Sequence, residues 1–267
     1  SLSWSLVFYS VAGLFILAWL WHRTALPTPY NESIHLLRKQ QRCEQMAERW
    51  MEVKKQVQTL FTQHTRQQLL AVFFFAFIFL FPEALTSKVV MLFLVDANHN
   101  GGLGLSPQEF GLAFGTVGVV ALIAGSLIGK NLIATKDLST CLLPISVALL
   151  FTNAFYIALS ETQPTSLGVI AISILLGQMG LGMVLNVFHE ALKTLANKLA
   201  QPVALVLLTS VVALGQMLPS MFSGALQEWW GYNNLFLAAL ICGIISLAGC
   251  FWIKPMLQHE HNENKKK

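Results

Sequence analysis

Long uninterrupted apolar stretches constrain this chain more than any other feature. A helix that crosses a bilayer needs about 20 mostly apolar residues. Seven stretches meet that requirement: Trp4–Trp21, Leu69–Val95, Phe110–Gly129, Leu138–Leu159, Leu167–Phe188, Pro202–Leu226 and Asn233–Ile253. Backbone polar groups in lipid must be satisfied internally, and continuous apolar runs favour helices over alternating barrel strands. We therefore expect an all-α, polytopic transmembrane helix bundle of about seven spans.

The composition excludes an ordinary soluble enzyme. Of the 267 residues, 55% are hydrophobic and only 11% are charged, whereas soluble domains carry about 25% charge. So few charges cannot cover a water-facing surface. The cysteines show no C-x-x-C spacing, which indicates small packing residues rather than metal ligands or a disulfide framework. We expect membrane lipid as a partner, and neither a cofactor nor nucleic acid.

Lysine and arginine alternate between successive loops. The segment from 22 to 68 is rich in both, whereas the loop from 96 to 107 contains neither. Later basic positions are Lys130, Lys136, Lys193, Lys198, Lys254 and Lys265 to Lys267. Every second loop is thus basic. Because cytoplasmic loops carry the excess of Lys and Arg, we expect the long loop and the C-terminus to be cytoplasmic.

One helix, a long basic loop and six closely spaced helices resemble the second half of a twelve-helix major facilitator transporter. The chain starts inside an apolar run, which we interpret as the end of a missing N-terminal half. We expect residues 1–22 to be the last helix of that half and 23–68 a cytoplasmic linker. Residues 69–254 would form the six-helix C-terminal half, and 255–267 a polar cytoplasmic tail.

The linker has an amphipathic pattern. Its apolar residues recur at alternating steps of three and four among charges: Cys43, Met46, Trp50, Val53, Val57 and Leu60. This periodicity predicts a helix with one apolar face. That face could lie on the membrane surface, where basic residues meet anionic lipid, or pack beneath the helix bundle.

One acidic residue stands out within the apolar stretches. Glu83 lies mid-way along Leu69–Val95, directly after Pro82, which removes a backbone donor. Ionisable residues inside spans are costly, which favours a functional role. Since desolvation penalises a charged carboxylate, this group could load and release a proton near neutral pH. The alternative is a purely structural buried pair with Lys88, or placement at an interface.

Lys88 follows Glu83 by five residues, roughly 140° around a helix. It could pair with Glu83 only if the helix were broken between them. Otherwise Lys88 points toward another helix, the lumen or an anionic substrate. We assign both residues to proton coupling or substrate binding, with a purely structural role left open for each.

Glycines and prolines mark where helices could approach closely or bend. Small-x-x-x-small pairs permit close helix contact, and bending is how alternating access opens one side of a transporter. The packing or hinge candidates are Pro82, Gly111, Gly115, Gly118, Gly125, Gly129, Gly177, Gly180 and Pro219. Polar candidates for a substrate cavity are Gln178, Asn186 and Gln216, each of which could instead bond a neighbouring helix.

Two sequence motifs resemble AmpG-like major facilitator proteins, the group of muropeptide permeases and acetyl-CoA transporters. The first is Gly104 to Gly111 with the glycines that follow, similar to the entry to their eighth helix. The second is Gly215 to Tyr232, similar to their eleventh helix and the loop after it. Pro82-Glu83-Ala84 falls where such proteins carry an acidic residue in the seventh helix. The resemblance covers most of 69–254.

This resemblance implies a bacterial inner-membrane permease whose relatives import muropeptides together with protons. Our leading hypothesis is a secondary active transporter, a proton-coupled symporter of a polar small-molecule solute, with Glu83 as the coupling carboxylate. The alternative is a degenerate, non-transporting membrane protein that acts as a sensor or scaffold through its basic loop. A membrane-embedded enzyme would need clustered nucleophile or metal residues, and the sequence shows no such motif.

Overall fold

The structure is a computed structural model that describes residues 2–25, 35–199 and 202–264. The chain divides into two compact units, Ser1–Glu52 and Val53–Lys267. Within the described ranges the regular structure is entirely helical, and no strand occurs. The all-α prediction is therefore confirmed.

The first unit contains helix α1 (Leu2–Ala25) and the start of helix α2 (His35–Gln63). Large apolar side chains of α1, such as Phe15 and Leu17, are exposed within this unit. Near its end, the Arg23 guanidinium lies 5.4 Å from the centre of the Trp19 ring. A helix that exposes apolar side chains needs lipid or other helices around it, as expected for the first predicted span.

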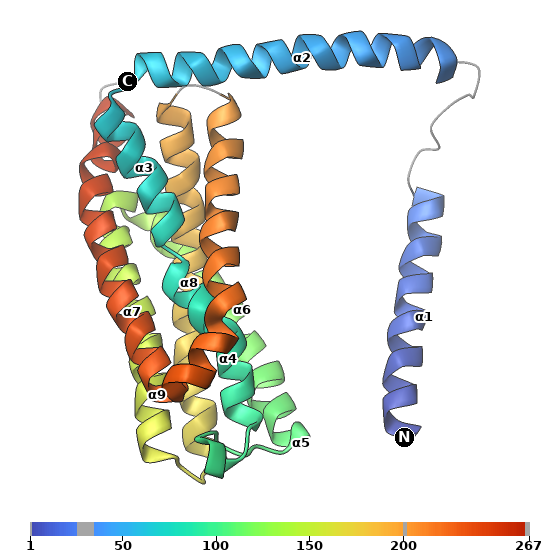
Figure 1. The fold of residues 1–267 in the computed structure, drawn as a ribbon, viewed down its shortest axis with the longest axis vertical. Coiled ribbons are helices and arrows are strands. Elements are labelled where there is room, and N and C mark those ends of the chain that lie inside the picture. Colours follow the sequence, from blue (N-terminus) through green and yellow to red (C-terminus); the bar gives the residue numbers. More distant parts are fainter. Residues whose placement is uncertain (1, 26–34, 200–201, 265–267) are drawn as a thin grey trace. The chain divides into compact units, whose positions relative to one another are not determined.

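The second unit is a bundle of long helices, drawn in teal to red in Figure 1. Its elements are α3 (Arg66–Ile78), α4 (Phe81–Val95), η2 (Asn98–Asn100), α5 (Pro107–Phe110), η3 (Gly111–Gly118), α6 (Val119–Thr135), α7 (Leu138–Thr162), α8 (Leu167–Lys198) and α9 (Pro202–Asn264). The segment η3 is a π-helix that joins α5 to α6 without leaving the helical path.

Five segments of the described chain are long and apolar enough to cross a membrane: Arg66–Val95, Pro107–Thr135, Leu138–Thr162, Leu167–Lys198 and Val203–Leu257. The last covers 55 residues, twice what one crossing needs. It reverses direction at Gly231, whose φ of 75° and ψ of 171° are non-helical. Figure 1 shows that the two limbs of α9 run in opposite directions from this turn. These limbs match the two last predicted spans. The first predicted span forms α1 but is not among the five.

The first span of the bundle is broken in its middle. Helix α3 ends at Ile78 and α4 begins at Phe81, with Leu80 at φ −95° and ψ 5° between them. Pro82 occupies the first turn of α4, where its missing N–H is no loss because that donor has no partner within the helix. The break directly precedes Pro82, so Glu83 lies in the first turn of a new helix rather than mid-helix.

The bundle core has two clusters, one toward each end. The first joins α3 and α8 through aromatic side chains: the rings of Phe79 and Phe188 are stacked, with centroids 4.5 Å apart. The second joins α4, α7 and α9, where the Phe236 ring lies 5.2 Å from Phe93 and 5.6 Å from Tyr156. Such aromatic contacts fix the axial positions of the helices against one another.

The end of the linker helix belongs to the first core cluster. Leu60 of α2 is fully buried there, and a ring nitrogen of His64 lies 3.3 Å from the Leu199 carbonyl. In the described structure α2 thus contacts the bundle at Leu60, near its C-terminal end, which is one of the two placements that the amphipathic pattern allowed. Trp50, on the other side of the unit boundary, is 75% exposed. The side chains of Cys43 and Met46 lie outside the described residues.

Two helices run further than the apolar stretches predicted. Helix α8 continues to Lys198 because Ala191, Leu192 and Leu195 extend its buried stripe beyond Phe188. The second limb of α9 continues to Asn264, into the range 255–267 that the sequence assigned to a polar tail. Both extensions are helices that project past the apolar part of the span.

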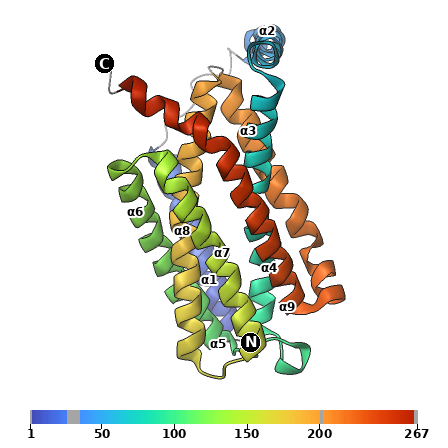
Figure 2. The same ribbon diagram turned by 90° about the vertical axis from the view of Figure 1, so that its left-hand side faces the viewer.

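Helices α6 and α8 lie side by side along most of their length, as Figure 2 shows. Glycines permit this approach. A Cβ atom on Gly125 would meet the backbone of Met179, and one on Gly129 would lie 2.9 Å from the Met183 Cα. From the other side, a Cβ atom on Gly182 would meet the Leu122 backbone. These contacts hold the two helices at backbone distance.

Candidate functional site

The Glu83 carboxyl group is the centre of the candidate site. The break before α4 places Glu83 in the first turn of that helix. The residue is half-buried, but its Oε2 atom is fully buried and has no hydrogen-bond partner in the part of the chain that the structure describes. Buried polar atoms are nearly always bonded, so an orphaned carboxylate oxygen needs a proton, a water molecule or a ligand.

Hydroxyl groups surround Glu83 but donate to backbone carbonyls. Thr86 Oγ1 donates to the Pro82 carbonyl at 3.2 Å. Ser220 Oγ of α9 donates to the Ala84 carbonyl at 2.8 Å. Ser246 Oγ of α9 donates to the Phe79 carbonyl at the helix break, at 3.1 Å. Both limbs of α9 are thus bonded to the backbone on either side of Glu83, which holds the break in place without satisfying the carboxyl group.

A second buried polar pair lies on α7. Asn153 is fully buried, and its Oδ1 atom also lacks a partner among the described residues. Tyr156 follows by three residues, on the same face of α7, and is buried in the core cluster that also contains residues of α4. The sequence reasoning missed both residues because it considered charges first. A lone Asn or Tyr in an apolar stretch carries the same kind of signal, more weakly.

Lys88 does not join Glu83. Helix α4 is continuous from Phe81 to Val95, so the two residues point to different sides. Lys88 is exposed, and among the described residues no ion pair forms with it. Of the placements considered from the sequence, the structure excludes the direct pair with Glu83. Its assignment to substrate binding stays a hypothesis.

The three polar cavity candidates are separated. Asn186 donates from Nδ2 to Ser126 Oγ of α6 at 2.5 Å. It thus bonds a neighbouring helix, the alternative to a place in a substrate cavity. Gln178 is half-buried, with its Cγ near Gly118. Gln216 is half-buried beside Gly215, which packs against the Phe77 backbone. Among the described residues, no hydrogen bond joins any of the three to Glu83.

The packing and hinge candidates differ in how closely they contact neighbouring helices. Gly118, Gly177 and Gly180 lie in ordinary or tight contact with neighbouring helices. At Gly177, for example, an added Cβ atom would lie 3.1 Å from the Thr152 Cγ2 atom. A Cβ atom added to Gly111 or Gly115 would have no neighbour within 4 Å among the described residues. Pro219 lies inside a continuous helix, and α9 departs from helical backbone angles only later, at Gly231.

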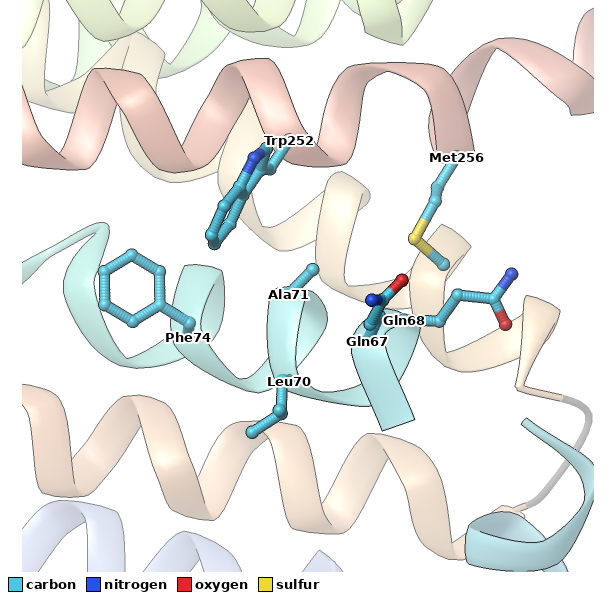
Figure 3. Close-up of a pocket in the computed structure, with 7 residues that line it drawn as sticks. All are labelled: Gln67, Gln68, Leu70, Ala71, Phe74, Trp252 and Met256. Atoms are coloured by element: carbon cyan, nitrogen blue, oxygen red, sulfur yellow. The ribbon is translucent and has the colours of Figure 1, made fainter. Parts of the chain in front are cut away.

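A large groove in the bundle lies away from these residues. It has a volume of about 690 Å³ and runs between α3 and the second limb of α9. Figure 3 shows Trp252 and Met256 facing Ala71 and Phe74 across it, with Gln67 and Gln68 at one end. The Phe74 and Trp252 rings meet edge to face, with centroids 6.4 Å apart. None of the residues predicted to carry function lines this groove.

A polar loop closes the end of α4. Asp96 accepts hydrogen bonds from Asn100 Nδ2 at 3.0 Å, from the Tyr232 hydroxyl at 2.9 Å and from the Ala97 amide at 2.9 Å. The bond from Asn100, followed by that from Tyr232, lowers the pKa of Asp96 below its ordinary value of 3.8. Because Tyr232 directly follows the reversal of α9, this carboxylate joins the α4 end to that turn.

The chain is similar in sequence to bacterial permeases. No protein-family model matches the chain. Over 152 residues it is 29% identical to the anhydromuropeptide permease of Escherichia coli (strain K12), and the same values hold for the anhydromuropeptide permease of Escherichia coli O157:H7. The match covers 56% of this chain but only 31% of each permease. With its long apolar helices, this similarity indicates an integral membrane protein that resembles a solute transporter rather than an enzyme.

Proposed function

We propose that the chain is part of a proton-coupled secondary transporter that moves a muropeptide or a similar sugar-peptide across the bacterial inner membrane by alternating access. The similarity to two permeases named for anhydromuropeptides supports the substrate class. The proposal extends beyond the matched part, which is about a third of each relative. The missing remainder of the transporter would supply the opposite wall of the cavity.

The observation that carries the proton-coupling part is the orphaned Oε2 atom of Glu83. A carboxyl group that is held at a helix break, and that has no cationic partner among the described residues, favours its protonated form in apolar surroundings and its charged form once water enters. Alternating access supplies that change of surroundings in each cycle. Glu83 therefore takes up a proton when the cavity faces one side and releases it on the other.

Hydrogen bonds from both limbs of α9 support such a cycle. Ser220 and Ser246 hold the backbone at Ala84 and Phe79, so movement of α9 is transmitted to the turn that carries Glu83. The break between α3 and α4 provides the flexible point, because the helical hydrogen bonds are interrupted there. Lys88, exposed on the same helix, is assigned to contact with an anionic group of the substrate.

The test is uptake of radiolabelled anhydromuropeptide by cells that express the gene encoding this chain and lack their own permease. We compare the wild type with Glu83→Gln, and with Glu161→Gln as the matched control, since Glu161 is exposed at the end of α7. Uptake by the wild type and the control, with loss in Glu83→Gln, is the expected result. Absence of uptake by the wild type would remove the muropeptide assignment, and equal uptake by all three would remove the role of Glu83.

A further inference from the structure

A second pocket lies between α6 and α8, at the end of the bundle where α6 stops. Its volume is about 410 Å³. Helix α6 contributes Lys130, Ile133 and Ala134, and α8 contributes Asn186, His189, Glu190 and Lys193. The four residues of α8 occupy positions i, i+3, i+4 and i+7, so they share one face of the helix. Neither the permease-like motifs nor the Glu83 site includes this pocket.

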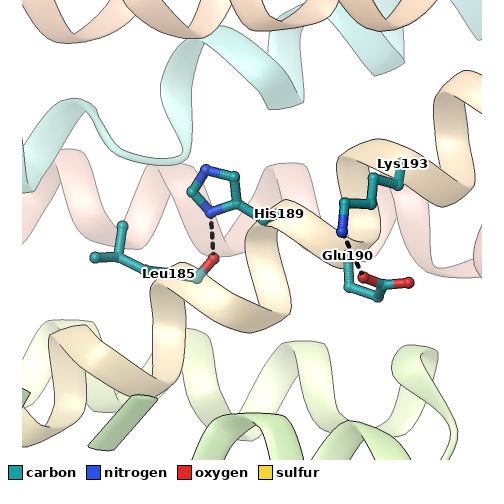
Figure 4. A network of polar contacts seen from close by, with 4 residues as sticks. All are labelled: Leu185, His189, Glu190 and Lys193. Atoms are coloured by element: carbon teal, nitrogen blue, oxygen red, sulfur yellow. Dashed lines mark hydrogen bonds and ion pairs between the residues drawn. The ribbon is translucent and has the colours of Figure 1, made fainter. Parts of the chain in front are cut away.

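The charges around the pocket do not balance. Lys193 Nζ lies 3.3 Å from Glu190 Oε2, and Figure 4 shows Glu190 directly after His189 with Lys193 one turn further along α8. Lys130 faces the same pocket, is exposed, and has no ion-pair partner among the described residues. Two ammonium groups therefore share one carboxylate. The surplus positive charge attracts an anion that can reach both lysines.

The rest of the lining is held in fixed positions. His189 Nδ1 lies 2.7 Å from the Leu185 carbonyl, as Figure 4 shows, so Nδ1 carries a hydrogen and Nε2 remains for a ligand. Asn186 Nδ2 is bound to Ser126 Oγ at 2.5 Å and to the Gly182 carbonyl at 3.2 Å. The bond to Ser126 joins α8 to α6 beside the pocket, whereas the bond to Gly182 lies within α8.

The glycine contacts explain why the pocket persists. Helices α6 and α8 are in close contact at Gly125, Gly129 and Gly182, and Gly129 directly precedes Lys130. The pocket beside this contact is lined by longer side chains from both helices. The close contact next to the pocket fixes the distance between the helices there.

We propose that this pocket is an oxyanion-binding site, in which Lys130 and Lys193 hold a carboxylate or phosphate group. An ammonium group binds such anions as a point charge through charge-assisted hydrogen bonds. The oxyanion comes either from a water-soluble solute, such as a peptide carboxylate, or from the headgroup of an anionic lipid. The site requires no transport activity, so it stands or falls separately from the proposed function.

The test measures how fast each lysine reacts with an amine-selective succinimidyl ester, read by peptide mass spectrometry. The full chain is reconstituted in nanodiscs of phosphatidylcholine, with N-acetyl-L-alanine as the soluble carboxylate and N-acetyl-L-alaninamide as its uncharged counterpart. In the second arm, phosphatidylglycerol replaces part of the phosphatidylcholine and no soluble probe is present. Lys136, exposed just past the pocket, serves as the internal reference.

We expect an anion to slow labelling of Lys130 and Lys193 but not of Lys136. Protection by N-acetyl-L-alanine and not by its amide assigns the oxyanion to a solute, and protection only with phosphatidylglycerol assigns it to a lipid. Lys130→Gln then weakens binding about tenfold, the loss of one charge-assisted hydrogen bond, whereas Lys136→Gln leaves it unchanged. No protection in either arm, or equal protection of Lys136 or by the amide, overturns the proposal.

Discussion

At the scale of single residues, identical sequence patterns have different surroundings. Gly111/Gly115 and Gly125/Gly129 share the same small-x-x-x-small spacing on one span, yet in the described structure only the second pair meets a neighbouring backbone. The spacing predicts which glycines share a face, but the partner helix decides whether that face is covered. For α6 the partner is α8, which follows a whole further helix in the chain.

A pair of alanine substitutions tests this difference. Gly125→Ala places a methyl group against the Met179 backbone, whereas Gly115→Ala meets no atom within 4 Å. Because overpacking costs about 1–3 kcal/mol, we expect Gly125→Ala to lower the apparent melting temperature of the purified protein in detergent. The Gly115→Ala variant should melt at or above the wild-type temperature. Equal melting of the two variants would show that α6 and α8 are not in backbone contact.

The Asp96 loop gives a prediction about pH. The hydrogen bonds from Asn100 and Tyr232 lower the pKa of Asp96, so they stabilise the loop above the ordinary pKa of 3.8 and this stabilisation is lost as pH falls below it. Tyr232→Phe removes one donor, which raises the pKa of Asp96 toward its ordinary value. The amides of Leu103, Gly104 and Leu105, which close the loop, should then exchange faster with solvent.

Amide hydrogen exchange, corrected for intrinsic rates, measures this effect between pH 7 and pH 3. In the wild type we expect protection of those amides to fall only at the acidic end of the range. In Tyr232→Phe protection should fall at a higher pH. Exchange that is independent of both pH and the substitution would contradict a stabilising role for the Asp96 bonds.

At the scale of elements, the sequence indicated where helices run but not how they join. The apolar stretches located all six spans of the bundle, because hydrophobic length is a local property. The break before Pro82 is held by tertiary contacts, such as the Ser246 bond to the Phe79 carbonyl, and the reversal at Gly231 by one backbone conformation. At Pro219 the helix continues, so its role as a hinge stays a prediction.

The reversal of α9 depends on one backbone conformation. Gly231, at φ 75° and ψ 171°, occupies a region that essentially only glycine adopts. We expect Gly231→Ala to lower the free energy of unfolding by about 1–3 kcal/mol through backbone strain. Gly224→Ala is the matched control: both glycines have open space for a Cβ atom, but Gly224 is helical. Denaturation in mixed micelles compares the two.

That control should be neutral or stabilising, since alanine favours a helix more than glycine does. A loss of stability in Gly224→Ala as large as in Gly231→Ala would mean that side-chain crowding, not backbone conformation, explains both. No loss in Gly231→Ala would mean that the chain can reverse direction without the left-handed conformation.

At the scale of the whole molecule, composition and hydropathy correctly predicted an all-helical membrane protein. The candidate site was predicted only in part. Glu83 was evident from its charge in an apolar run, whereas Tyr156 and Ser220 come from elements distant in sequence that only the fold brings near α4. The pocket around Lys130 was missed for the same reason, because its lysines lie on two different helices.

In the proposed mechanism, each solute molecule that crosses the membrane is accompanied by protons that pass through Glu83. The internal pH of proteoliposomes containing the purified protein reports this coupling, recorded with a trapped fluorescent dye as anhydromuropeptide is added outside. We predict that addition acidifies the interior for the wild type and for Glu161→Gln, and that Glu83→Gln shows no acidification. Acidification that persists in Glu83→Gln, or solute entry by the wild type without any change in internal pH, would contradict proton coupling through Glu83.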